Sequence, residues 1–214
     1  MKKKYCVASF VCFMLFAVLI LLIKFADVAA IGPEGSQIGL SGINGAFQNA
    51  FPFNERIYEI TEITGYISLA FIGVFALLGL YQLISRKSLK KIDCDIYLLA
   101  GFYAAVIAFY VAFEVVVINY RPVLEDGALA ASFPSSHTLL AVCIMLSSAH
   151  QISKRVKTSN LKLAGITFCT VIMLITVIGR LFSGVHWLTD IMGGVLLSLA
   201  LFFAYLAVYK KITE

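Results

Sequence analysis

The chain has 214 residues, of which 61% are hydrophobic and only 14% are charged. Soluble domains carry about 25% charged residues, so this composition excludes a soluble globular domain and favours an integral membrane protein. The net charge of +5 does not indicate a nucleic-acid partner, because the basic residues gather in short segments between apolar runs.

The first apolar run extends from residue 5 to residue 23 and follows Lys2-Lys3-Lys4. It is longer than the roughly 7–15 residues of a signal-peptide core and close to the roughly 20 residues that span a bilayer. A cleaved signal peptide is the alternative, because Val28-Ala29-Ala30 loosely fits a cleavage site. We expect an uncleaved first transmembrane helix.

The segment 25–58 follows this helix and is not apolar enough to span. Its hydrophobic residues Leu40, Ile43, Phe47 and Phe51 recur at three- and four-residue steps. That spacing is typical of a short amphipathic helix lying in the membrane interface. The glycines of the segment disfavour a helix and leave a flexible connector as the alternative.

Five further apolar runs predict transmembrane helices at residues 63–84, 97–118, 134–151, 163–178 and 187–208. The chain is therefore expected to be all-α, a single domain (1–214) of six transmembrane helices with an interfacial segment after the first. Gly193-Gly194 predict close packing of the last helix against a neighbour. The five cysteines have no paired spacing and are expected to be packing residues rather than disulfides or metal ligands.

The distribution of basic residues predicts the topology. Thirteen of the 17 Lys and Arg residues lie at the N-terminus, in 86–91, in 154–162 and at 210–211. Six spans place these four segments on one side, and the positive-inside rule makes that side cytoplasmic. Both termini are then cytoplasmic in a multi-pass protein of the cell membrane, and the loops after the third and fifth spans face outward.

Three polar clusters interrupt the apolar sequence on the predicted outer side. They are Arg121-Pro122, Pro134-Ser135-Ser136-His137, and the set Arg180, His186 and Asp190. Arginine guanidinium groups match phosphate oxygens, and hydroxyls with free amides at a helix start bind anions. A carboxylate four residues after a histidine shares its helix face and fixes the imidazole tautomer, which leaves the other nitrogen free to attack. The second histidine is available as a general acid.

These clusters together resemble the motifs of the type-2 phosphatidic acid phosphatase superfamily: Lys-x6-Arg-Pro, Pro-Ser-Gly-His and Ser-Arg-x5-His-x3-Asp. Three positions depart from the pattern, with Ser136 in place of Gly, Gly179 in place of Ser and Glu114 in place of Lys. Ser183 is a candidate replacement for the hydroxyl missing at Gly179.

The resemblance implies a lipid phosphatase that needs no metal or cofactor. His186 would form a phosphohistidine, Asp190 would orient it, and His137 would protonate the leaving alkoxide. By the same resemblance the phosphoryl oxygens would be held by Arg121, Arg180, Ser135 and Ser136. The substrates implied are membrane lipid phosphates such as undecaprenyl diphosphate, phosphatidylglycerol phosphate or phosphatidic acid. The oligomeric state stays open.

Two other functions stay open from the sequence. A transferase of the same fold would pass the phosphoryl or head group to an acceptor other than water. A non-catalytic binder or transporter would use the cations only to hold an anionic head group.

Glu114 is a possible site neighbour, seven residues before Arg121. If its helix continues into the loop, two turns bring it near Arg121 and allow an ion pair with that residue or with Arg180. The alternative is a structural acid that meets a loop amide or reaches water.

Overall fold

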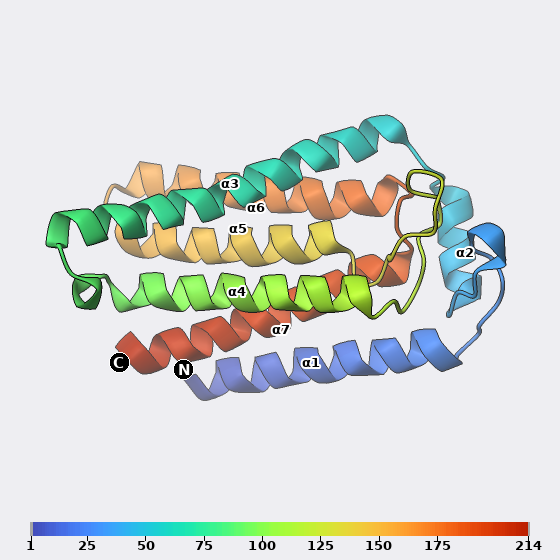
Figure 1. Cartoon of the computed structure of the whole chain (residues 1–214), viewed down its shortest axis with the longest axis horizontal. Helices are drawn as coiled ribbons and strands as arrows, with labels where there is room; N and C mark the ends of the chain where they lie inside the picture. Colours follow the sequence, from blue (N-terminus) through green and yellow to red (C-terminus); the bar gives the residue numbers. More distant parts are fainter. Residues whose placement is uncertain (1, 214) are drawn as a thin grey trace.

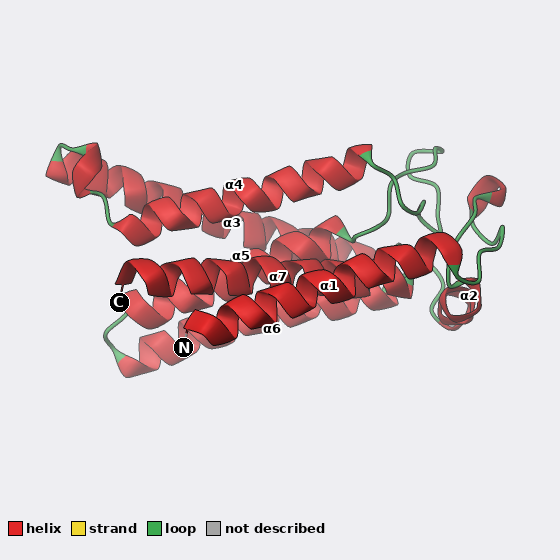
Figure 2. Ribbon diagram, turned by 90° about the horizontal axis from the view of Figure 1, so that it is seen from below, coloured by secondary structure: helices red, strands yellow, loops and turns green. Residues whose placement is uncertain are grey.

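The computed structural model describes residues 2–213, and they form helices and loops without a named strand (Figure 2). Six of the described helices are long, and they run along the bundle (Figure 1). They are α1 (Lys2–Phe25), α3 (Glu55–Arg86), α4 (Cys94–Val115), α5 (Ser136–Arg155), α6 (Ser159–Phe182) and α7 (Leu188–Thr213). The shorter elements are η1 (Pro33–Gly35), α2 (Ser41–Ala50) and η2 (Leu89–Lys91). The predicted all-α class is confirmed.

Five of the long helices, α1, α3, α4, α6 and α7, are long and apolar enough to cross a membrane. The sixth, α5, packs against α3, α4, α6 and α7. Because protein surrounds it, α5 carries polar residues that find partners on those helices. The hydroxyls of Ser147 and Tyr103 lie 3.1 Å apart, and Gln151 donates to the Tyr205 hydroxyl at 3.0 Å. The multi-pass membrane fold is confirmed, and the count of six spans stays a prediction.

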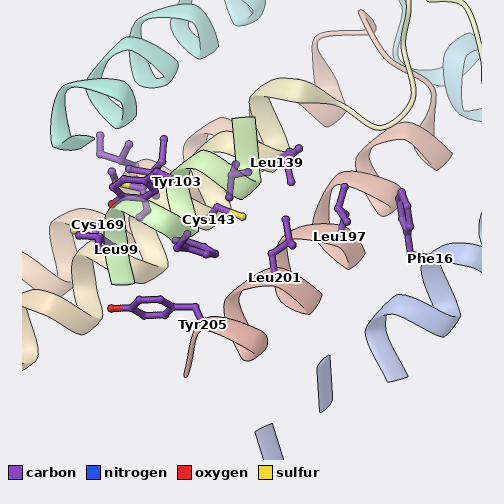
Figure 3. Close-up of a cluster of buried hydrophobic side chains, with 14 of the residues drawn as sticks. Phe16, Leu99, Tyr103, Leu139, Cys143, Cys169, Leu197, Leu201 and Tyr205 are labelled. Carbon is purple, nitrogen blue, oxygen red and sulfur yellow. The ribbon is translucent and has the colours of Figure 1, made fainter. Parts of the chain in front are cut away.

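The hydrophobic core runs between α5 and its neighbours and extends along α7 to Phe16 of α1 (Figure 3). Cys143 of α5 and Cys169 of α6 are fully buried within it. All five cysteines are free thiols, and Cys6 and Cys94 are exposed rather than packed in the interior. Gly194 of α7 packs closely against a neighbouring helix as predicted, because a Cβ there would lie 2.9 Å from the side chain of Thr138 in α5. Gly193 instead meets the ring of Phe133 in the loop before α5, at 2.3 Å from a Cβ placed there.

The two ends of the bundle differ in charge. The described chain ends and the basic α3–α4 and α5–α6 loops share one end, and α2 with the α4–α5 and α6–α7 loops lies at the other (Figure 1). At the basic end, Asp93 accepts hydrogen bonds from Arg86 at 2.6 Å and from Arg155 at 3.2 Å. Arg155 also donates to both carboxylate oxygens of Asp95 at 2.7 Å. These contacts tie α3, α4 and α5 together.

Helix α2 confirms the short helix predicted after the first span, and it is fixed to the first turn of α7 and to the loop before it. The buried Asn44 donates to the Thr189 hydroxyl at 3.0 Å and accepts from the Thr189 N–H at 3.2 Å. Gln48 donates to the Gly184 carbonyl oxygen at 3.0 Å. Gly184 has φ +67°, a conformation that favours glycine, and a Cβ there would also meet the backbone of Phe53. The segment around α2 therefore holds the α6–α7 loop in place.

Candidate active site

The fold brings all three polar clusters to the end of the bundle that carries α2. His186 lies in the α6–α7 loop and Asp190 in the first turn of α7. The Ser135 N–H donates to the Asp190 carbonyl oxygen at 3.0 Å, which joins the start of α5 to the start of α7. Trp187 donates its indole N–H to the Tyr120 carbonyl oxygen at 2.7 Å, which joins the α4–α5 loop to the same site.

Asp190 contacts His186 through a third residue that sequence reasoning missed. The His186 Nδ1 and the nearer Asp190 oxygen are 3.7 Å apart, too far for a good hydrogen bond. Ser132 lies between them, with its hydroxyl 3.0 Å from Nδ1 and 2.5 Å from Asp190 Oδ2. The Trp187 N–H donates to the same carboxylate oxygen at 2.9 Å. Any orientation of His186 by Asp190 is therefore indirect.

This arrangement fixes the tautomer of His186. A serine hydroxyl has one proton to donate, and Ser132 gives it to Asp190, which in its ionised form only accepts. Ser132 must then accept from His186, so Nδ1 carries the imidazole proton and Nε2 carries the lone pair. The Nε2 atom is buried and has no hydrogen-bond partner among residues 2–213. It is the nitrogen free to attack an electrophile.

The surroundings keep this imidazole neutral. His186 is 1% exposed. Burial first, and then the positive charges of Arg121 and Arg180, lower the pKa of His186 well below its usual range. An unprotonated Nε2 is the form a nucleophilic histidine requires.

Arg180 is fully buried, yet only part of its guanidinium is satisfied. Its Nη2 bonds Glu62 of α3, and its Cζ lies 4.8 Å from the centre of the Tyr58 ring. Its Nε and Nη1 are buried without a hydrogen-bond partner. Buried unpaired donors are costly, so their persistence here indicates a site for an anionic ligand.

Arg121 is held by its own loop. Its Nε donates to the Ala131 carbonyl oxygen at 3.2 Å, and its Nη1 lies 3.2 Å from Glu125. Glu125 is the more exposed partner, so the ion pair lies at the edge of the site.

The hypothesis that Glu114 pairs with Arg121 or Arg180 is wrong. The two arginines pair with Glu125 and Glu62 instead. The reason is that α4 ends at Val115, so no helix continues from Glu114 into the loop. Glu114 is exposed on the last turn and lines a small cleft that also contains Ser132 and Ser136.

The second cluster forms the start of α5. Ser135 is the N-cap, and its hydroxyl accepts from the Thr138 N–H at 3.4 Å. Ser136 is the first helical residue, so its N–H has no partner within the helix. His137 follows, with Nε2 3.1 Å from Glu62 and Nδ1 buried without a partner.

Gly179 stands where the phosphatase motif has serine, and packing explains this difference. A Cβ there would lie 2.4 Å from the Thr61 side chain, so glycine lets α6 approach α3. Ser183 is buried, and its hydroxyl donates to the Arg180 carbonyl oxygen at 3.0 Å.

Glu62 and Ser132 are site residues that the sequence analysis did not identify, and so is Tyr58 beside Arg180. An acid near the end of an apolar helix is a signal of function, so Glu62 could have been noticed. Ser132 carries no such signal, because its role depends on a contact across 58 residues.

Comparison with known proteins agrees with this geometry. Residues 116–214 match the family model of the PAP2 superfamily. Over 95 residues the chain is 32% identical to phosphatidylglycerophosphatase B of Bacillus subtilis (strain 168), a match covering 44% of this chain and 46% of that protein. Over 92 residues it is 27% identical to lipid phosphate phosphatase delta of Arabidopsis thaliana, covering 42% of this chain and 22% of that protein. The matches thus span less than half the length of either relative.

A solved structure shares the fold of nearly the whole chain. It is the crystal structure described as the first transmembrane PAP2 type phosphatidylglycerolphosphate phosphatase from Bacillus subtilis, with a TM-score of 0.71 and 21% identity. The match covers 97% of this chain and 98% of the solved one. The resemblance indicated by the motifs is confirmed: residues 116–214, the segment that carries them, match the family model of the PAP2 superfamily.

Proposed function

We propose that the chain is a membrane-embedded phosphatase that hydrolyses a lipid phosphate monoester or diphosphate through a phosphohistidine. One observation supports this most strongly: the lone-pair nitrogen of His186 is buried and unpaired, beside an arginine with two unpaired donors. A permanently structural histidine and arginine would satisfy these groups within the protein.

In the proposed reaction, Nε2 of His186 attacks phosphorus, and a P–N bond forms as the bond to the leaving oxygen breaks. His137 gives a proton to that oxygen, so the lipid leaves as a neutral alcohol or as a lipid monophosphate. Water then attacks the phosphohistidine, the P–N bond breaks, and His137 recovers a proton from that water. Arg180 and Arg121 offset the negative charge on the phosphoryl oxygens during both steps, with the amides at the start of α5.

The predicted metal independence rests on these arginines, which supply fixed positive charge where a metal ion would otherwise act. In the described part of the chain, no three His, Cys, Asp or Glu side chains gather as a metal-binding group. Phosphate release is expected to persist in strong chelator and to be inhibited by vanadate. Activity that requires one added-back metal ion would overturn this part of the proposal.

The substrate class follows from the surroundings of the site. The clusters lie at one end of a bundle of apolar helices, where a lipid head group meets the membrane surface. The names of the relatives, a phosphatidylglycerophosphatase and a lipid phosphate phosphatase, favour the same class. Since the basic segments gather at the opposite end, the positive-inside rule supports an extracytoplasmic site and cytoplasmic termini.

The test is a panel of purified lipid phosphates and diphosphates incubated with the protein in detergent. We expect inorganic phosphate release by the wild-type chain and none by His186→Ala, with both proteins equally folded. Transfer of the phosphoryl group to a lipid acceptor without phosphate release would favour the transferase. Binding without turnover of any lipid would favour the non-catalytic binder.

A further inference from the structure

Helix α3 contributes an acid to the site that lies outside all three sequence clusters. Glu62 Oε1 lies 3.1 Å from His137 Nε2 and also bonds Nη2 of Arg180. Its side chain is only 24% exposed. A carboxylate near the end of an apolar helix is costly to retain unless it has partners, and here both partners belong to the proposed catalytic machinery.

The contact with Glu62 decides which nitrogen of His137 faces the substrate. An ionised carboxylate can only accept a proton donor, so we infer that the Nε2 atom, 3.1 Å from Glu62 Oε1, carries a proton. The other nitrogen, Nδ1, is buried and has no partner. Glu62 thus occupies one side of the imidazole and leaves Nδ1 for the leaving group.

Arg180, like His137, contacts Glu62 with one nitrogen and leaves others free for the substrate. It uses Nη2 for Glu62, whereas its Nε and Nη1 are buried and unpaired. The phosphate can therefore be held by the free donors while Glu62 stays in place. This arrangement argues against the alternative that Glu62 occupies the phosphate position on Arg180 and must leave when the substrate binds.

The same face of α3 also accommodates the imidazole ring. Gly65 lies three residues after Glu62, and a Cβ there would lie 3.0 Å from Cδ2 of His137. Residues three apart share a helix face, so α3 offers the ring an acceptor and a gap without a side chain. Both features set the position of His137 relative to α3.

We propose that Glu62 is a positioning residue that holds His137 as the general acid. This inference rests on the proposed function. Glu62 bonds the Nε2–H and stabilises the imidazolium through its negative charge, so that the Nδ1–H points to the leaving oxygen. The proton on Nδ1 passes to that oxygen as the P–O bond breaks, and the imidazole stays bonded to Glu62 through Nε2.

The test compares two substrates that differ in their need for an acid. Departure of a lipid alkoxide needs a proton, whereas departure of p-nitrophenolate does not. Glu62→Gln keeps the size of the side chain and removes its charge. Glu59→Gln, on an exposed residue one turn earlier in α3, is the matched control.

We expect Glu62→Gln to lower kcat on a lipid phosphate by about 10- to 100-fold, less than the ~10²–10⁴-fold that a general acid itself contributes. On p-nitrophenyl phosphate the same variant should change kcat by less than about 3-fold. The ratio of the two rates within one preparation is independent of the folded fraction, so partial unfolding cannot produce this result. Glu59→Gln should keep the wild-type ratio.

Two outcomes would overturn the inference. A wild-type ratio in Glu62→Gln would show that His137 does not need Glu62. A rise in kcat/KM on both substrates would show that Glu62 competes with phosphate for Arg180. Failure of the proposed function looks different, because the wild-type chain would then release phosphate from neither substrate, and it would overturn both proposals.

Discussion

Replacing Ser132 with alanine tests whether the indirect link between Asp190 and His186 matters. The hydroxyl lies 3.0 Å from Nδ1 of His186 and 2.5 Å from the carboxylate of Asp190. Without it, the imidazole and the carboxylate face each other across 3.7 Å with no group between them. The Nδ1–H then loses its acceptor, and the lone pair of Nε2 is no longer fixed toward the phosphate.

The expected loss follows from the bond removed. A hydrogen bond to a charged group contributes about 1.5–3 kcal/mol, and each 1.4 kcal/mol in the barrier is about tenfold in rate. We therefore expect Ser132→Ala to lower kcat on a lipid phosphate by roughly 10- to 150-fold. KM should change little, because Ser132 does not belong to the proposed phosphate-binding groups. The loss should be equal on p-nitrophenyl phosphate, because it acts on the nucleophile.

The assay is steady-state phosphate release by the purified protein, with thermal unfolding measured on the same samples. Ser9→Ala is the matched control, because Ser9 is also buried and its hydroxyl donates to the Ala200 carbonyl oxygen at 2.8 Å, between α1 and α7 and away from the site. A kcat of Ser132→Ala within about 2-fold of wild type would refute the reasoning, since a bond worth at least ~1.5 kcal/mol would then be absent.

Four other outcomes are expected. Because the pKa of His186 is lowered, its imidazole should stay neutral as pH falls through about 6.5, the usual histidine pKa. The value of kcat/KM on p-nitrophenyl phosphate, corrected for substrate ionisation, should therefore stay level over this range. A decline centred near that pH would contradict this. Glu114→Gln should keep wild-type kinetics, because neither site arginine pairs with Glu114. Arg155→Ala should lower the free energy of unfolding by roughly 1–3 kcal/mol through its lost ion pairs, with kcat per folded molecule unchanged. In a background without native cysteines, a cysteine introduced at the exposed Asp126 should react with a membrane-impermeant thiol reagent on intact cells, and one at Lys157 should not. The reverse pattern would invert the topology.

The helices could be predicted because they depend on local sequence, and the location of the three clusters at one end followed from the alternation of the spans. An apolar run long enough to span forms a helix in the membrane, where its backbone can be satisfied only internally. Arg180, His186 and Asp190 lie close together in the sequence, so a short loop between two helices is enough to bring them near one another. The amphipathic repeat at Leu40, Ile43 and Phe47 predicted α2 in the same way.

The errors and omissions have physical causes as well. Hydropathy detects the apolar part of a helix and not the polar turns beyond it, so α3 was expected from residue 63 although it begins at Glu55. Glu62 was left outside the predicted span for this reason. The role of Ser132 depends on two loops meeting, which no local pattern encodes. Glu114 was misread because the end of α4 at Val115 could not be predicted.

The most direct test of the central claim is to trap the phosphorylated protein. A lipid substrate labelled with ³²P in its phosphate is mixed with the wild-type chain, and the reaction is quenched in alkali, in which phosphohistidine survives. The account predicts an alkali-stable, acid-labile label on the peptide that contains His186, and no label in His186→Ala. Turnover of the lipid with no label on that peptide at any quench time, or full turnover by His186→Ala, would contradict it.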